Sequence, residues 1–185
     1  NSLIWGENLE NISITGPGRI WGKGLVRTGN QSRTKEQNDA LANVAPDPRA
    51  AAFGYPNVRD AVEPGWGNKS IALKLCRNVL IRDISILQGG HFGILATGVD
   101  NLTIDNVKID TNRDGMNIDS CKNVRISNAT INSPFDDGIC LKSSHGLGYA
   151  RATENVTITN CQVSGYDVGT LLDGTYKREY RAANG

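Results

Sequence analysis

Apolar and polar residues alternate with a period of two in several short segments of this chain. Residues 123–127 are Asn-Val-Arg-Ile-Ser, and residues 155–159 are Asn-Val-Thr-Ile-Thr. Such alternation is typical of a strand with one buried face. No part of the sequence shows a sustained apolar stripe at helical spacing. The pattern therefore predicts an all-β protein built from short strands.

These strands belong to an internal repeat. A phrase of Asn, an aliphatic residue, any residue and Ile begins at Asn11, Asn78, Asn101, Asn123 and Asn155. Successive copies from Asn78 onward are 23, 22 and 32 residues apart, and the last interval equals one period plus a loop of about ten residues. This period suits a solenoid whose turns pair only with neighbouring turns. We therefore predict a right-handed parallel β-helix with about 22 to 23 residues per turn.

A second polar residue follows each copy of the phrase at a fixed distance. The positions five residues after the repeat Asn are Asp83, Asn106, Asn128 and Asn160. Short amide and acid side chains tolerate left-handed backbone and can hydrogen-bond along a stack. We expect them to form a column at a corner of the coil. Leucine-rich repeats have a similar period, but their Leu-rich signature is missing here.

The repeat extends over most of the chain. We predict a single β-helix domain over residues 1–185, truncated relative to a complete solenoid because no terminal cap is evident. A long segment from about 27 to 68, which holds several prolines and aromatic residues, interrupts the repeat. Long ordered loops often build binding walls, and a flap that shields the apolar end of the strands is the alternative.

Composition excludes several classes of function. The 20 basic and 19 acidic residues give a net charge of +1, which argues against a nucleic-acid partner. No apolar run is long enough to span a membrane, and no signal peptide is evident at the start. The four cysteines, Cys76, Cys121, Cys140 and Cys161, lack the spacing of a zinc site, and we interpret them as small buried thiols.

Acidic residues gather when the repeats are aligned on the Gly that opens the next strand. One column then contains Phe92, Asp114, Asp137 and Val168, and the column before it contains His91, Arg113, Asp136 and Asp167. Adjacent turns lie about 4.8 Å apart, so Asp114, Asp136 and Asp137 should cluster. Like charges this close should raise at least one pKa, which leaves a protonated acid beside an ionised base. Cleavage of a glycosidic bond requires that pair.

Another mixed column lies five residues further on. It contains Thr97, Asp119, Lys142 and Asp173. One hypothesis is an outward ion-pair ladder in which the acids flank Lys142. The other makes Lys142 a hydrogen-bond donor to a sugar or its carboxylate. His91 has two interpretations as well, a contact with bound sugar or a hydrogen-bonded surface histidine at a turn.

Two motifs carry a family resemblance. Residues 112–121, Asn-Arg-Asp-Gly-Met-Asn-Ile-Asp-Ser-Cys, and 136–143, Asp-Asp-Gly-Ile-Cys-Leu-Lys-Ser, resemble the Asn-Thr-Asp-Gly and Asp-Asp motifs of the polygalacturonases, glycoside hydrolase family 28. The resemblance implies an inverting hydrolase of pectic polysaccharide that needs no metal or other cofactor. Asp136 would be the general acid, and Asp114 and Asp137 would activate water. Carboxyl groups about 6.5 to 9.5 Å apart are expected for inversion.

The sequence departs from the family at three places. Arg113 replaces the Thr of the first motif, residues 165–169 stand where the family has Gly-His-Gly, and no Arg-Ile-Lys phrase occurs up to residue 185. The pattern therefore suits a rhamnogalacturonan-type substrate as well as polygalacturonan. The residues expected to bind the sugar chain are Arg113, Asp119, Lys142, His91, Tyr166 and Asp167. The resemblance further implies a secreted or periplasmic monomer that acts on cell-wall pectin.

Two other classes of function remain open. In a polysaccharide lyase, Asp114, Asp136 and Asp137 would hold calcium, since clustered carboxylates suit hard cations. Arg113 or Lys142 would then take the C5 proton of the sugar. The third class is a non-catalytic carbohydrate-binding or structural solenoid, for which Asp136→Asn would change neither turnover nor product.

Overall fold

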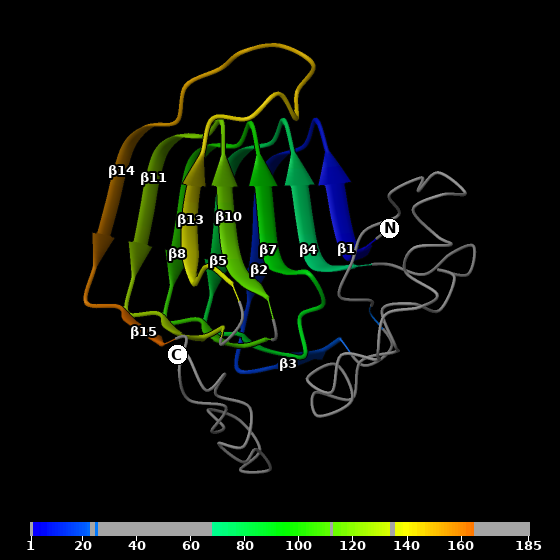
Figure 1. Ribbon diagram of the computed structural model, residues 1–185, viewed down its shortest axis with the longest axis vertical. Coiled ribbons are helices and arrows are strands. Elements are labelled where there is room, and N and C mark those ends of the chain that lie inside the picture. The colour runs from blue at the N-terminus through cyan, green and yellow to red at the C-terminus, as the bar shows by residue number, and fades with distance from the viewer. Residues whose placement is uncertain (1, 23–24, 26–67, 112, 134–135, 165–185) are drawn as a thin grey trace, which may run out of the picture.

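The computed structural model describes residues 2–22, 25, 68–111, 113–133 and 136–164 (Figure 1). Every helix or strand element within these ranges is a β-strand. The strands form three parallel sheets of five strands each. Each inner strand pairs with the equivalent strands of the turns before and after it, and the strands at the sheet edges pair on one side. The predicted all-β solenoid of parallel strands is therefore confirmed.

The three sheets follow one another along each turn of the coil. The first sheet contains β1 (Ser2–Glu7), β4 (Lys69–Lys74), β7 (Phe92–Thr97), β10 (Asp114–Asp119) and β13 (Ile139–Lys142). The second contains β2 (Glu10–Thr15), β5 (Arg77–Arg82), β8 (Asp100–Asp105), β11 (Lys122–Ser127) and β14 (Glu154–Thr159). The third contains β3 (Arg19–Trp21), β6 (Ser85–Leu87), β9 (Lys108–Asp110), β12 (Thr130–Asn132) and β15 (Gln162–Ser164).

The core lies inside the coil and consists of stacked aliphatic side chains. In the first sheet Ile71 pairs with Ile94, and Ile94 pairs with Met116. All three are fully buried. Burial of a side chain this size stabilises the fold by about 1.5 to 3 kcal/mol. Stacking of equivalent apolar positions therefore fixes the register of the whole solenoid.

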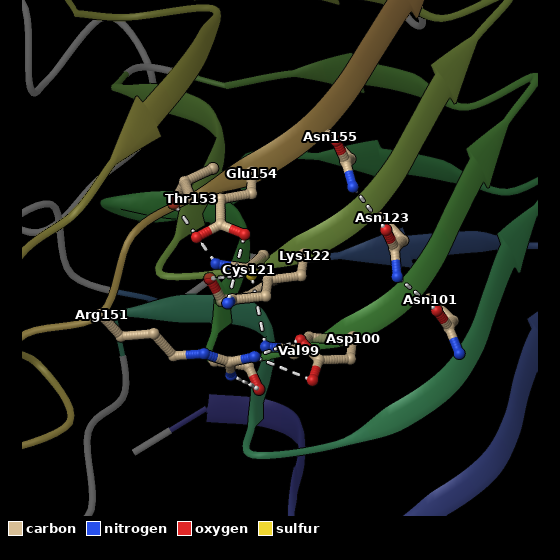
Figure 2. A network of polar contacts seen from close by, with 12 residues as sticks. Val99, Asp100, Asn101, Cys121, Lys122, Asn123, Arg151, Thr153, Glu154 and Asn155 are labelled. Atoms are coloured by element: carbon tan, nitrogen blue, oxygen red, sulfur yellow. Dashed lines mark hydrogen bonds and ion pairs between the residues drawn. The ribbon is translucent and has the colours of Figure 1, made fainter.

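The repeat Asn forms a ladder that the sequence pattern did not reveal. Asn101, Asn123 and Asn155, at the start of second-sheet strands, have φ values of 54°, 57° and 55°. Asn123 donates to Asn101 at 3.1 Å, and Asn155 donates to Asn123 at 3.0 Å (Figure 2). Two further bonds continue the ladder through Asn78 to Asn11. Asn tolerates this left-handed backbone, so each copy turns the chain and joins two neighbouring coils.

The corner five residues later agrees with its prediction. Asp83, Asn106, Asn128 and Asn160 all have positive φ values, between 48° and 66°. Asn106 donates to Asp83 and Asn160 donates to Asn128, whereas Asn128 donates to Asp105. This column is therefore bonded along the stack, with one bond diverted to the neighbouring position.

The predicted extra loop connects β13 to β14, and it arches away from the coils in Figure 1. Arg151 anchors it two turns back by donating to both carboxylate oxygens of Asp100, at 2.6 and 2.8 Å, and to the carbonyl of Gly98 (Figure 2). Ser144, at its other end, binds Asp119. The loop is thus held beside the first sheet.

Three other predictions are resolved only in part. All four cysteines are free, and Cys76 and Cys121 are buried as expected, whereas Cys140 and Cys161 are half-buried. No helix among the described residues could cross a membrane. Residues 27–67 of the predicted long loop lie outside the described residues, as do Tyr166 and Asp167.

Candidate active site

Three stacked glycines shape the corner that leads into the first sheet. A Cβ on Gly115 would lie 2.5 Å from the carbonyl oxygen of Gly138 and 2.5 Å from Cγ2 of Ile131. A Cβ on Gly138 would lie 2.2 Å from Cγ1 of Val163, and Gly93 is similarly confined. A side chain at Gly115 or Gly93 would therefore force the facing backbone of the next coil to shift. The Gly after Asp114 and after Asp137 therefore lets neighbouring coils approach closely at this corner.

The three acids predicted to cluster do so. Asp114, Asp136 and Asp137 each offer one carboxylate oxygen, and these oxygens lie within 4.8 Å of one another. Asp114 is buried, Asp136 is half-buried and Asp137 is exposed. Inversion is implied by the family resemblance, for which carboxyl groups about 6.5 to 9.5 Å apart are expected.

Asp114 lies on the floor of the cluster, where 3% of its surface is exposed. Its Oδ2 accepts a hydrogen bond from Asn117 Nδ2 at 2.5 Å and lies 3.6 Å from Lys142 Nζ. Burial raises the pKa of Asp114 above its ordinary value, the Asn117 hydrogen bond opposes this, and the charge of Asp136 adds to it. The folded protein therefore favours the protonated form of Asp114 more than water does.

Asp136 has the opposite environment. It accepts hydrogen bonds from Nε of Arg113 at 2.8 Å and from Nη2 of the same guanidinium. Burial disfavours its charge, but the hydrogen bond and charge of Arg113 outweigh burial and hold the pKa of Asp136 below its ordinary value. The pKa values of the two acids are thus displaced in opposite directions, and the protonated form is favoured more at Asp114 than at Asp136. The resemblance, by contrast, makes Asp136 the general acid.

Asp119 and Lys142 lie in the predicted register, but their side chains bind residues other than those predicted. Asp119 pairs with Thr97 on one side and Lys142 on the other. The carboxylate of Asp119 accepts from the backbone N–H of Ser144 at 2.8 Å and from its hydroxyl at 2.5 Å. Lys142 forms its ion pair with Asp114 instead. The hypothesis of an ion-pair ladder is therefore wrong for the described residues. Asp173 lies outside them.

His91 is the remaining predicted site residue within the described part of the chain. His91 stacks on Phe92, with ring centroids 4.3 Å apart, and its backbone N–H donates to the carbonyl of Asn68.

Asn117 is a residue of the site that the sequence pattern did not predict. It lies on a strand that is buried throughout, two positions before Asp119 and on the same face. The alternation of Asn117 and Asp119 with apolar residues was the available signal.

A groove of about 690 Å³ runs across the outer face of the first sheet. Its lining includes residues from β1 to β13 and from the loop after β13, among them Trp5, Lys69, Phe92, Asn117, Asp119 and Lys142. Asn117 and Lys142 also contact Asp114. The three acids do not line the groove themselves, but these two contacts place its wall against the acidic cluster. Extended grooves lined by apolar surface and a few polar groups are suited to chain-like ligands.

Comparison with known proteins agrees with the fold. The family model for the right-handed beta helix region matches residues 58–180, in agreement with the predicted hand of the coil. A crystal structure from Parabacteroides merdae ATCC 43184, of a protein provisionally described as a glycosyl hydrolase, is similar with a TM-score of 0.55 and 18% identity. The alignment covers 88% of this chain and 62% of that one. At this identity the likeness shows the fold alone. No curated protein matches the chain.

Proposed function

We propose that this chain, which belongs to the right-handed beta helix family, is a glycoside hydrolase that cleaves pectic polysaccharide of the polygalacturonan or rhamnogalacturonan type. One observation carries the proposal: carboxylate oxygens of Asp114, Asp136 and Asp137 converge within 4.8 Å of one another beside a groove, and the pKa values of Asp114 and Asp136 are displaced in opposite directions. Carboxyl groups with divided protonation states are the usual machinery of glycosidic hydrolysis. The resemblance to the polygalacturonases and the hydrolase description of the Parabacteroides merdae protein support it.

The catalytic roles follow from exposure and protonation. Of the two, Asp114 has the raised pKa and is the more readily protonated, whereas Arg113 lowers the pKa of Asp136. Asp136 is the more exposed of the two. Substrate that draws Arg113 away lets Asp136 take a proton and deliver it to the glycosidic oxygen. The bond from that oxygen to the anomeric carbon then breaks.

Water completes the reaction. The oxygen of a water molecule bonds to the anomeric carbon, and Asp137, the exposed member of the cluster, takes its proton. The products are two shorter chains, one with a new reducing end. General acid and base groups of this kind contribute about 10²- to 10⁴-fold each. No metal takes part in this proposal.

Digestion of two defined substrates tests the proposed function. Homogalacturonan and rhamnogalacturonan are incubated separately with the full chain, and the products are identified by mass. We expect fragments of one substrate that carry the mass of one added water per cleaved bond. Intact polymer in both reactions, under conditions where the protein is folded, would contradict the proposal and favour a non-catalytic carbohydrate-binding solenoid.

A calcium-dependent polysaccharide lyase is the second candidate. The convergence of three carboxylate oxygens within 4.8 Å favours it, because calcium takes oxygen ligands from carboxylates. Against it, Arg113 and Lys142 already pair with two of the three carboxylates. A lyase would give unsaturated products that absorb ultraviolet light, and a chelator would abolish its activity. Hydrolytic products that persist in chelator would exclude it.

A further inference from the structure

Lys69 lies in the same column of the first sheet as the proposed catalytic acids. It pairs with Phe92, which pairs with Asp114 on the following strand. Because adjacent strands are about 4.8 Å apart, Lys69 and Asp114 are separated by about 10 Å along the stack of coils. A sugar chain that lies in the groove and runs from the β4 side toward Asp114 therefore passes Lys69 and Phe92, which both line the groove.

The ammonium group of Lys69 has a neutral partner, unlike two neighbouring groove cations. Lys74 pairs with Glu7 at 3.3 Å, and Lys142 pairs with Asp114 at 3.6 Å. Among the described residues, Lys69 Nζ donates a hydrogen bond to the side-chain carbonyl of Asn68, at 2.7 Å. The amide fixes the position of the ammonium group without cancelling its charge. Lys69 thus presents a positioned positive charge to the groove.

Burial adds a reason for this charge to bind an anion. Lys69 is half-buried, and burial lowers its pKa below the ordinary value for lysine. A negative group on the ligand would offset that cost, since an opposite charge nearby favours the charged form. Phe92 is half-buried beside it and lines the same groove. Its ring gives an apolar surface between the cation and the acids, suited to one face of a sugar ring.

We propose that Lys69, with Phe92 beside it, binds the carboxylate of a uronic acid unit that lies two strands away from the cleaved bond. The site deepens the proposed function and rests on it for the direction in which the sugar chain runs. It selects acidic chains over neutral ones at a position separate from Arg113 and Lys142. The specificity of the groove is thus set partly by a residue outside the acidic motifs.

Calorimetric titration with a matched pair of ligands tests the site. The full chain carries Asp136→Asn so that the ligand stays intact, and it is titrated with an oligogalacturonide or with the same oligosaccharide after its carboxyl groups are reduced to alcohols. Lys69→Met should weaken binding of the acidic ligand by about 10- to 100-fold, since a charge-assisted hydrogen bond is lost. Binding of the reduced ligand should change by less than about twofold.

Three further variants make the result specific. Lys108→Met removes the same charge from an exposed position on β9, in the third sheet, and should leave both affinities unchanged. Lys69→Arg keeps the charge and should retain most of the affinity for the acidic ligand. If Lys69→Met does not fold, as judged by its thermal unfolding midpoint, Lys69→Gln replaces it, because its amide still offers a donor to Asn68.

The possible outcomes separate this site from the proposed function. Equal losses for acidic and reduced ligands, or no loss for either, would overturn the Lys69 site even if hydrolysis is observed. Failure of the parent to bind the acidic ligand would overturn it too. Selective loss of the acidic ligand in a protein that does not hydrolyse pectin would support the site and refute the hydrolase.

Discussion

Two stacked sets of polar side chains, the Asn ladder at the start of the second sheet and the acidic cluster at the start of the first, differ in how their members are satisfied. Each ladder amide both donates and accepts, so Asn123 can bind Asn101 and Asn155 at once. A carboxylate only accepts, and even a protonated carboxyl group has a single donor. Asp114 and Asp136 therefore draw most of their hydrogen bonds and ion pairs from side chains of other kinds, Asn117, Lys142 and Arg113.

The comparison separates a structural column from a chemical one. The ladder repeats the same residue on every coil, and its bonds run along the stack. The acidic column changes identity at each step, from Phe92 to Asp114 to Asp137. A mixed column of this kind does not stabilise itself by stacking, since like charges repel. We infer that the ladder serves the fold and that the acidic cluster serves chemistry.

The largest expected effect comes from removing a carboxyl group from the acidic cluster. Asp114→Asn keeps the shape of the side chain but removes its ionisable group, and we expect the rate of cleavage to fall by about 10²- to 10⁴-fold. Initial rates of reducing-end formation measure the loss. The urea midpoint should stay close to that of the parent at neutral pH. If the variant unfolds instead, Asp114 serves mainly to stabilise the fold, as the residues of the Asn ladder do.

The next effect concerns the glycines that support the acidic column. Gly115→Ala forces a methyl group against Gly138 and Ile131, and we expect a loss of about 3 kcal/mol in the free energy of unfolding. Urea denaturation measures it. Gly18→Ala is the matched control, because a Cβ there meets nothing within 4 Å. Equal stability of the two variants would show that the corner is less tightly packed than described.

Ladder substitutions should affect stability and leave activity alone. Asn101→Ala loses two amide bonds and places Ala at a φ of 54°, so we expect a loss of about 2 kcal/mol. Asn101→Gly keeps the backbone freedom and should lose about 1 kcal/mol. Urea midpoints give the order of the three proteins. A large fall in turnover for either variant would remove the distinction between ladder and cluster.

The smallest effect is the pH dependence of stability. The pKa of Asp114 is raised by burial, so its contribution to stability is fully present below the unfolded value of about 4 and is lost as pH rises through the folded pKa. The free energy of unfolding of the wild type should therefore fall relative to Asp114→Asn as pH rises from about 4. Asp136 has the opposite effect on stability. Its pKa is lowered in the folded protein, so its contribution to the free energy of unfolding is lost as pH falls. Denaturation of both proteins over a pH series measures the difference, and a reversed slope would contradict the proposed protonation of Asp114.

Repeat spacing was sufficient to predict the coil and the columns. In a parallel coil equivalent positions must stack, so Asp114 and Asp137 become neighbours as soon as the register is known. Partners of long side chains were not predictable in this way. Lys142 has a flexible four-carbon stem, and it pairs with Asp114 instead of its register neighbour Asp119.

Protonation was the least predictable property. The pKa of Asp114 depends on its depth in the corner and on Asn117, and that of Asp136 depends on the orientation of Arg113. Sequence spacing fixes which residues are adjacent but not how deeply each carboxyl is buried. The left-handed backbone of the repeat Asn was missed for a related reason, because alternation makes that residue look like an ordinary outward position on a strand.

Incorporation of a heavy oxygen isotope from water tests the central claim most directly. The full chain and its Asp136→Asn variant digest the pectic substrate in water enriched with that isotope, and product masses are recorded. If the acidic cluster hydrolyses the bond, each new reducing end made by the wild type carries one heavy oxygen atom, and the variant makes almost no product. Unlabelled, unsaturated ends, or equal labelling by the variant, would contradict the account.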